Sequence, residues 1–278
     1  MLNRRSSVAV NQAQGFMPAT STVTGATILI TGASSGIGAA LARAHASPGV
    51  RLVLCGRDVA RLEDVARACR ESGAIAEMAR FDLTDVMAMS RQMEMADAAA
   101  PIDLVFLNAG LGGSLPPGDA AQNLDAAYRM AMVNFTAPVV AANLMADRMA
   151  RRGSGRIVLI GSVAQAFPLP MAPTYAGTKT GLAMFSRALR LRLEGSGVGI
   201  TLVVPGFVDT PMSRGLPDPR PFLLTPARAA AIIRRGVASG RREVVLPWHF
   251  AVIMTLAQWL PRAAIEAVLR RMFRRSRA

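Results

Sequence analysis

Two polar residues near the middle of the chain, Tyr175 and Lys179, stand four positions apart. In a helix, side chains at this spacing lie on one face, so the phenol and the ammonium group can meet. A free tyrosine titrates near pH ~10, which is too high for a good acid or base at neutral pH. A cation one helical turn away favours the phenolate and is expected to lower the tyrosine pKa. The pair therefore has the chemistry of a proton donor, although Tyr and Lys at this spacing also form ordinary surface pairs.

The scarcity of both residue types singles this pair out. The chain has 32 basic residues, of which Lys179 is the only lysine, and Tyr128 is the only other tyrosine. Arginine does not easily replace lysine where a compact charge with an adjustable pKa is needed. A chain that hardly uses lysine or tyrosine still places one of each a helical turn apart, which favours a catalytic role.

The composition narrows the class of protein. A chain of 278 residues fits one large α/β domain or two small ones. Cys55 and Cys69 are too few for a disulfide framework, and no cysteine or histidine cluster suggests a metal site. Because His45 and His249 are the only histidines, Ser-His-Asp hydrolysis and metal–histidine chemistry are disfavoured. A reducing, cytoplasmic setting fits this composition best.

The net charge of +14 is concentrated in loops and in the C-terminal tail. The arginines that gather there are Arg151, Arg152, Arg234, Arg235, Arg241, Arg242, Arg262, Arg270, Arg271, Arg274, Arg275 and Arg277. They form either a solvated basic surface or a surface for an anionic membrane or acidic partners. Nucleic acid is disfavoured as a partner, because no recognised motif or interleaving of aromatic and basic residues occurs.

A strand, a glycine turn and a helix follow one another near the start of the ordered chain. The apolar run 27–30 predicts a buried strand, and it leads directly into Thr31-Gly-Ala-Ser-Ser-Gly-Ile-Gly38. In this context a glycine pattern predicts a dinucleotide site, whose phosphates lie against the N–H groups of the helix N-terminus. Gly32 would allow the tight turn, Gly36 the approach of the pyrophosphate and Gly38 the contact of helix with strand. The cofactor-binding residues predicted in this turn are Gly32, Ser34, Ser35, Gly36, Ile37 and Gly38.

The residues after the second predicted strand, 51–55, indicate which cofactor binds. A ribose with a free 2′-hydroxyl is usually held here by an acidic side chain. Gly56 occupies that place and Arg57 follows it, and arginine is suited to bind a 2′-phosphate through paired N–H donors. This pattern favours NADP(H) over NAD(H), with Ser34 as a further donor. The alternative is an arginine that only faces solvent.

The rest of the chain continues the alternation of strands and helices. Further strands are predicted at 75–80, 102–107, 156–160, 199–204 and 243–246, and helices at 58–72, 84–98, 122–150, 175–195 and 226–239. Such alternation predicts an α/β fold, a Rossmann-type doubly wound parallel sheet of about seven strands, in one domain over 25–246. Asp82 and the segment Asn108-Ala109-Gly110 follow predicted strands, at the ends where ligands bind in such sheets.

These motifs, in this order, resemble the common single-domain type of the short-chain dehydrogenase/reductase family, from about residue 26 to 246. The segment 31–38 matches the cofactor turn of the family, and Asp82 matches the residue near the adenine ring. Asn108, Ala109 and Gly110 match the segment that supports the central sheet, and Pro205, Gly206 and Thr210 match the segment that closes over the nicotinamide. Asn134, Ser162, Tyr175 and Lys179 fall on the catalytic tetrad.

The resemblance implies a role for each member of the tetrad. Ser162 would hydrogen-bond the substrate oxygen, and Tyr175 would give that oxygen a proton during reduction or take it during oxidation. Lys179 would lower the tyrosine pKa and hold the nicotinamide ribose, while Asn134 would connect Lys179 to solvent through its helix backbone and a water. Gln165 departs from the family, in which glycine is commoner, and leaves the substrate preference open.

The implied function is hydride transfer between NADP(H) and a carbonyl or secondary alcohol group of a moderately apolar small molecule. The family also implies a homo-oligomer. The alternative from a different class is a cofactor-binding scaffold or redox sensor that keeps the fold and turns over little.

The two ends of the chain are expected to lie outside the catalytic domain. Residues 1–24 predict a flexible leader without a signal peptide, and no stretch has the ~18–20 apolar residues needed to span a bilayer. The tail, 247–278, is apolar over 248–260 and then amphipathic. Its apolar stripe comprises Ile265, Val268, Leu269, Met272 and Phe273. The tail is interpreted as a helical extension that packs on the substrate side or on a partner subunit, or as a peripheral anchor at an anionic membrane surface.

Overall fold

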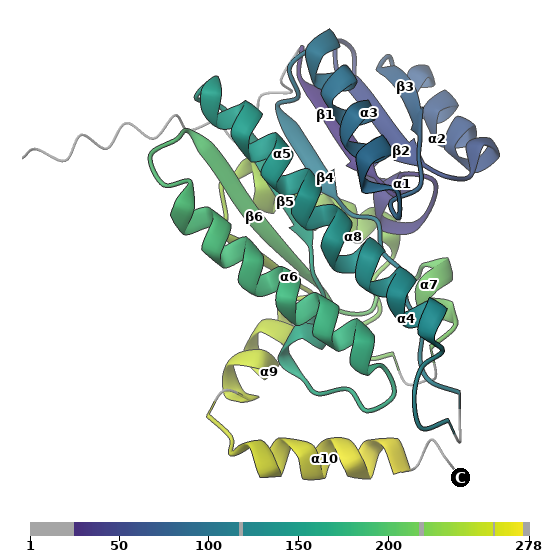
Figure 1. The fold of residues 1–278 in the computed structure, drawn as a ribbon, viewed down its shortest axis with the longest axis vertical. Helices are drawn as coiled ribbons and strands as arrows, with labels where there is room; N and C mark the ends of the chain where they lie inside the picture. The colour runs from purple at the N-terminus through teal and green to yellow at the C-terminus, as the bar shows by residue number, and fades with distance from the viewer. Residues whose placement is uncertain (1–24, 117–118, 217–219, 258, 275–278) are drawn as a thin grey trace, which may run out of the picture.

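A parallel β-sheet of seven strands forms the centre of the computed structural model, which describes residues 25–116, 119–216, 220–257 and 259–274 (Figure 1). In chain order the strands are β1 (Thr27–Thr31), β2 (Arg51–Gly56), β3 (Ile75–Arg80), β4 (Leu104–Leu107), β5 (Gly155–Ile160), β6 (Val198–Pro205) and β7 (Glu243–Leu246). Their spatial order is β3-β2-β1-β4-β5-β6-β7, and every neighbouring pair is parallel. The prediction of a doubly wound sheet of about seven strands is confirmed.

The strand order reverses direction between β1 and β4. The chain starts at β1, builds outward through β2 and β3, and then returns to the other side of β1 for β4 to β7. In open α/β sheets, the carboxyl ends of the two strands at such a reversal border a crevice in which ligands bind. The glycine turn follows β1 and the Asn108 segment follows β4, so both lie at this crevice.

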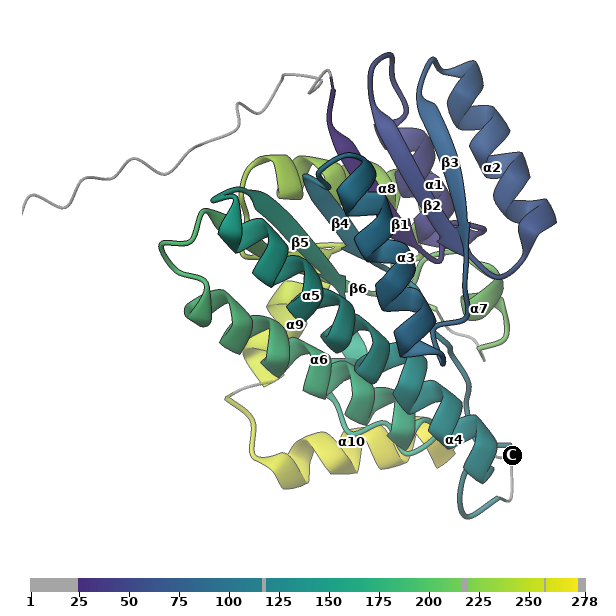
Figure 2. The ribbon, with the colours of Figure 1, turned by 45° about the horizontal axis from the view of Figure 1, so that its top comes forward.

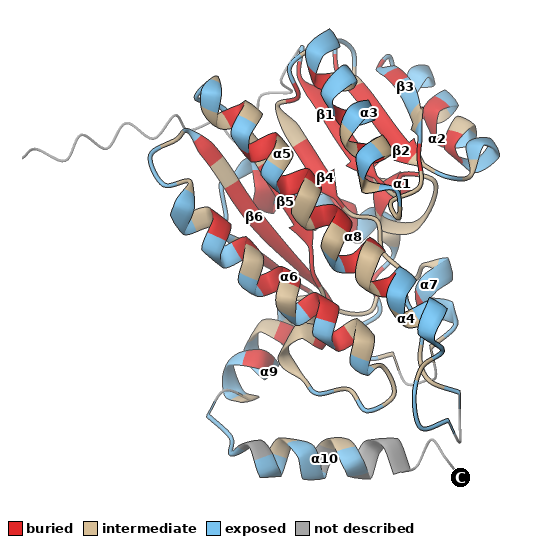
Figure 3. Cartoon of the chain, viewed as in Figure 1, coloured by how far each residue is buried: buried red, intermediate tan, exposed pale blue. Residues whose placement is uncertain are grey.

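Helices cover both faces of the sheet because alternate strand residues face opposite sides. In β1, Ile28 and Ile30 belong to one buried apolar cluster, and Leu29 belongs to the other. The first cluster includes residues of α1 (Gly36–His45), α2 (Val59–Glu71) and α8 (Pro226–Ala238), and the second includes residues of α3 (Val86–Ala99), α5 (Ala137–Arg151) and α6 (Pro173–Arg192). The strands other than the edge strand β3, which is largely exposed, are buried along most of their length, while the helices turn their exposed residues outward (Figure 3).

The predicted long helix over 122–150 is interrupted at Asn134. It consists of α4 (Leu124–Ala131), a π-helical turn (Met132–Thr136) and α5. Such a turn accommodates an extra residue and changes which side chains face the protein. Apolar periodicity alone does not reveal it, because the residues on both sides keep a helical spacing.

Two further boundaries differ from the sequence prediction. Helix α6 begins at Pro173 and not at Tyr175, since proline is suited to the first turn of a helix, where its missing N–H is not needed. The predicted loop 207–225 contains a short helix, α7 (Pro211–Arg214), whose start is capped by the Thr210 side chain.

The C-terminal region adds two helices, α9 (His249–Ala257) and α10 (Arg262–Arg274). Both views place them together at one end of the molecule, with α10 at its margin (Figures 1 and 2). Among the described residues, no helix is long and apolar enough to cross a bilayer. Residues 1–24 and the side chains of Val268, Met272 and Phe273 lie outside the description, and the division into 25–246 and 247–278 stays a prediction.

Candidate active site

A cavity of about 1350 Å³ lies at the carboxyl ends of the strands. The predicted site residues that line it are Gly32, Ser34, Ser35, Gly36, Ile37, Arg57, Asp82, Asn108, Ala109, Gly110, Ser162, Tyr175, Lys179, Pro205, Gly206 and Thr210. Gly38 and Asn134 are the two predicted site residues that do not line it. Site residues predicted in seven separate segments of the chain therefore line one cavity.

The glycine turn after β1 is held against the Asn108 segment. Gly32 has φ +67°, and a Cβ built on it would lie 2.8 Å from the Ala109 Cα. The Asn108 Nδ2 donates to the Thr31 carbonyl at 3.0 Å, and the Asn108 N–H donates to the Thr31 hydroxyl at 3.0 Å. A Cβ on Gly38 would overlap the Gly32 carbonyl oxygen. Gly38 therefore acts by close contact within the turn and not at the cavity surface.

The first turn of α1 offers a binding site for an anionic group. Ser35 precedes the helix, and its side chain makes no capping hydrogen bond. The first N–H groups of a helix have no partner within the helix and carry a partial positive charge. A Cβ built on Gly36 meets only Thr210 within 4 Å, so this side of the turn is otherwise open. These observations fit the diphosphate of a dinucleotide.

Arg57 and Asp82 meet at the rim of the cavity. The Arg57 Nη1 lies 3.5 Å from the Asp82 Oδ2, and both side chains are exposed. Hydrogen bonds from Thr84 and the charge of Arg57 hold the pKa of the Asp82 carboxyl below its usual value. Ser34 is adjacent, with its hydroxyl 3.7 Å from a Cβ built on Gly56. Arg57 is therefore placed at the cavity beside Asp82, a contact that the sequence analysis did not foresee.

Ser162, Tyr175 and Lys179 gather at the ends of β5 and α6. The Ser162 hydroxyl accepts a hydrogen bond from the Ala164 N–H at 3.1 Å, which fixes its orientation at the start of a 3₁₀ turn (Val163–Ala166). The Lys179 Nζ lies over the Tyr175 ring, 5.8 Å from its centroid. The phenol and the ammonium thus share one face of α6, as their spacing predicted.

Lys179 is only 4% exposed. Its Nζ donates to the Ile160 carbonyl at 2.9 Å, and no carboxylate forms an ion pair with it in the described part of the chain. Burial disfavours the charged form and lowers the Lys179 pKa to about 8. A Cβ built on Gly110 would be 3.7 Å from Nζ, so the Asn108–Gly110 segment runs beside this ammonium group.

The pKa of Tyr175 shifts in the direction opposite to the prediction. Burial of the phenol raises the Tyr175 pKa, and this effect outweighs the hydrogen bond with Ser162, which lowers it. The sequence predicted a lowered pKa from the nearby cation. That prediction was wrong because the spacing of the two residues gives their proximity but not the loss of solvent around the phenol.

Asn134 is fully buried in the π-helical turn. Its Oδ1 accepts from the Leu111 N–H at 2.7 Å, and its Nδ2 donates to the Leu111 carbonyl at 2.8 Å. The side chain therefore holds the segment after Gly110 in place beside Lys179. Both ends of its amide bind Leu111, so the relay that the family resemblance implies would depend on the backbone of the turn.

Apolar side chains of the C-terminal tail form part of the wall of the main cavity. Its side chains that line the cavity are Phe250, Ile253, Leu256, Ala257, Leu260, Ile265 and Leu269, all of them apolar. Ile265 and Leu269 are half-buried, so this part of the apolar stripe of α10 faces the protein. The contact favours the interpretation that the tail packs on the substrate side over that of a membrane anchor. The sequence showed the apolar run of the tail, but not that its side chains face the cavity.

Gln165 does not line the main cavity. Its amide nitrogen and oxygen are buried and have no hydrogen-bond partner among the described residues. The Gln165 Oε1 lies 3.0 Å from a Cβ built on Gly161, so the amide is turned toward the end of β5. Gln165, which stands where glycine is commoner in the family, therefore fills space near the end of β5 and not space in the main cavity.

Comparisons with known proteins agree with the motifs. The family model for short chain dehydrogenases matches residues 26–220. An uncharacterized oxidoreductase of Myxococcus xanthus is 32% identical over 249 residues, which cover 88% of this chain and 97% of the relative. The ketoacyl reductase HetN of Nostoc sp. is 32% identical over 230 residues, which cover 81% of this chain and 79% of the relative. A short-chain dehydrogenase of Sphingobium yanoikuyae, solved in complex with NADPH, has a TM-score of 0.72 and 30% identity, covering 86% of this chain and 97% of that one.

Replacing the buried lysine should change how stability depends on pH. An unfolded lysine has a pKa of 10.5, so between about pH 8 and 10.5 the unfolded state binds more protons than the folded state. The free energy of unfolding of the wild-type protein should therefore rise with pH across this window. Lys179→Met should be more stable at neutral pH by up to about 3 kcal/mol, and this advantage should shrink toward pH 10.5.

Urea denaturation of both proteins at about pH 7 and about pH 10 measures the difference. A stability difference that is equal at the two pH values would contradict a lowered Lys179 pKa.

Proposed function

The chain belongs to the short chain dehydrogenase family, and from this premise we propose that it transfers a hydride between NADP(H) and a carbonyl or secondary alcohol group of a moderately apolar small molecule. The observation that carries the proposal is one continuous cavity. It begins at the uncapped start of α1 and contains half-buried Tyr175, buried Lys179 and Ser162. Its remaining wall is largely apolar, which suits a substrate of low polarity.

The residues of this chain would hold the cofactor along the cavity. The N–H groups at the start of α1 would bind the diphosphate, Asp82 would lie near the adenine, and Pro205, Gly206 and Thr210 would border the nicotinamide. When bound, the nicotinamide supplies or accepts the hydride. The preference for NADP(H) rests on Arg57, on Gly56 in the place of an acidic residue, and on the NADPH of the Sphingobium relative.

The protein groups would control the substrate oxygen and its proton. During reduction, the Ser162 hydroxyl would donate to the carbonyl oxygen as negative charge develops on it. The Tyr175 phenol would then transfer its proton to the same oxygen, and in the oxidation direction the phenolate would take the proton back. Lys179 would stabilise the phenolate and would bind the nicotinamide ribose. Asn134 would keep Leu111 and the neighbouring segment in place around the ammonium.

We also infer that the chain forms a homo-oligomer. Large apolar side chains are exposed on α4, the π turn and α6: Leu124, Tyr128, Phe135, Met184 and Leu191. A second copy of the chain is the partner that the family suggests for this surface. Light scattering on the purified protein measures the assembly, and a monomer at micromolar concentration would contradict it.

Tyr175→Phe should abolish carbonyl reduction while leaving cofactor binding intact. The variant removes the proton donor and keeps the ring that packs beside Lys179, so the loss should be at least about 10²-fold in turnover. The measurement is NADPH oxidation over a panel of ketones, aldehydes and ketoacyl thioesters, together with NADPH binding by fluorescence. Turnover retained in the variant would overturn the mechanism, and a wild-type protein that binds NADPH but reduces nothing would favour a scaffold or redox sensor.

Arg57→Ala should weaken the binding of NADPH far more than that of NADH. Loss of the charge-assisted bonds to a 2′-phosphate should cost about 10- to 100-fold in NADPH affinity. Arg67→Ala is a matched control, because Arg67 is as exposed as Arg57, also pairs with an aspartate, and lies outside the cavity. Equal losses for the two cofactors would mean that Arg57 is only a surface charge.

A further inference from the structure

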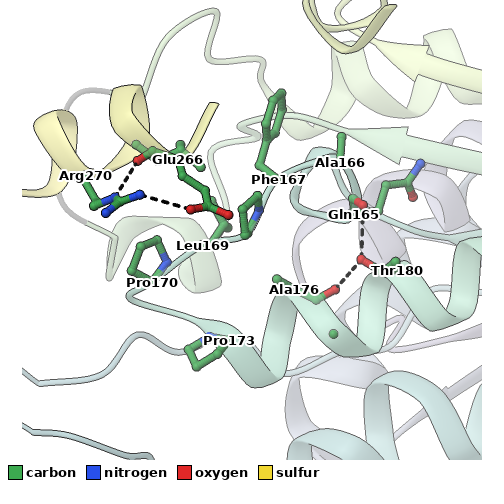
Figure 4. A pocket seen from close by; sticks show the side chains of 13 residues that line it. Gln165, Ala166, Phe167, Leu169, Pro170, Pro173, Ala176, Thr180, Glu266 and Arg270 are labelled. Atoms are coloured by element: carbon green, nitrogen blue, oxygen red, sulfur yellow. Dashed lines mark hydrogen bonds and ion pairs between the residues drawn. The ribbon is translucent and has the colours of Figure 1, made fainter. Parts of the chain in front are cut away.

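A second cavity, of about 660 Å³, lies between α10 and the start of α6 (Figure 4). Figure 4 shows Glu266 and Arg270 on α10 at one side and Ala176 and Thr180 on α6 at the other. The segment 165–173, which contains three prolines, forms the rest of the wall. None of Ser162, Tyr175 and Lys179 lines this space. It is therefore separate from the reacting centre.

The two cavities have a common apolar wall. Phe167, Leu169 and Leu269 line both of them, and all three side chains are half-buried. Ile265 precedes Leu269 by one helical turn and lines only the main cavity. The same face of α10 thus runs from the main cavity to the second one. The space near Tyr175 and the space beside α10 therefore share these three apolar side chains as a wall.

The chemistry of the second cavity favours an apolar occupant. Most of its lining is proline, alanine, leucine and phenylalanine. The charged residues on its wall, Glu266 and Arg270, form an ion pair with each other at 3.1 Å. The Thr180 hydroxyl donates to the Gln165 and Ala176 carbonyls, at 3.1 and 2.8 Å. Glu266, Arg270 and Thr180 are therefore engaged with protein partners, and the Gln165 amide is the polar group of the wall without one among the described residues. The apolar surface has no described chain against it.

We propose that this second cavity binds the distal part of the substrate, and that the substrate is a carbonyl compound or alcohol with an extended apolar chain. The reacting group would lie at Tyr175, and the chain would pass Phe167, Leu169 and Leu269 to reach the face of α10. The wall that the two cavities share and the apolar lining of both carry this inference. It rests on the proposed function and adds to it the substrate class and the part of the protein that selects it.

Gly177 offers a way to fill the second cavity alone. It lines this cavity but not the main one, and a Cβ built on it meets nothing within 4 Å. Gly177→Phe would place a ring in the space of the chain without a backbone clash. Gly177→Ala is the matched control, because it also raises the helix propensity at this position but adds little volume. Gly177→Leu replaces the phenylalanine variant if that variant does not fold.

The experiment measures NADPH-dependent reduction of 2-alkanones from 2-butanone to 2-nonanone. Each buried methylene is worth about fourfold in binding, so kcat/KM of the wild-type protein should rise at least about tenfold along the series. Gly177→Phe should lower the ratio of kcat/KM for 2-nonanone to that for 2-butanone at least about tenfold, and Gly177→Ala should keep it. The same chain-length dependence in both folded variants would overturn the proposal.

Binding without turnover separates this inference from the proposed function. Calorimetry of 2-nonanone should give an affinity at least about tenfold weaker in Gly177→Phe than in Gly177→Ala. If this loss occurs in a protein that reduces no ketone, the proposed function fails while the assignment of the cavity stands. If ketones are reduced but the binding of 2-nonanone is equal in both variants, the assignment of the cavity fails alone.

Discussion

A lysine ammonium group buried without a carboxylate partner among the described residues is the constraint on which the candidate site depends. Taking a charge out of water is costly unless hydrogen bonds or an opposite charge compensate it. The Lys179 Nζ donates a hydrogen bond to the Ile160 carbonyl and lies over the face of the Tyr175 ring. The described structure thus holds this group in an environment that disfavours its charge, and the lowered pKa of about 8 expresses that cost. In the proposed complex, hydroxyl groups of the nicotinamide ribose would accept hydrogen bonds from this ammonium group and relieve part of that cost.

The surrounding fold is arranged so that this group stays in place. Parallel pairing of β5 between β4 and β6 brings the Ile160 carbonyl to the carboxyl edge of the sheet. The π-helical turn directs Asn134 at Leu111, and this contact holds the segment beside Nζ. The glycine turn is tied to the same segment through Asn108. Hydrogen bonds from asparagine side chains to the backbone therefore connect the glycine turn to the segment beside the Tyr175–Lys179 pair.

The parts of this arrangement that the sequence predicted are those that depend on local chemistry. The strand and glycine turn around Gly32 follow from residues that adjoin in the chain, and the Tyr175–Lys179 contact follows from helical spacing. The ion pair of Arg57 with Asp82, the contact of Asn134 with Leu111 and the direction of the tail depend on segments far apart in the chain. The Tyr175 pKa was predicted in the wrong direction for the same reason, because burial is a property of the whole fold.

In the proposed mechanism, Lys179 and the bound cofactor together make Tyr175 a usable acid. Tyr128 is 64% exposed, so Tyr128→Phe leaves a folded protein with Tyr175 as its one tyrosine. Titrating tyrosinate absorbance in this variant measures the Tyr175 pKa directly. Without cofactor, we expect a Tyr175 pKa above that of a free tyrosine. With NADP⁺ we expect this pKa to fall by at least about one unit, and we expect no such fall when Lys179→Met is added. A Tyr175 pKa that NADP⁺ leaves unchanged, or a fall that persists without Lys179, would contradict it.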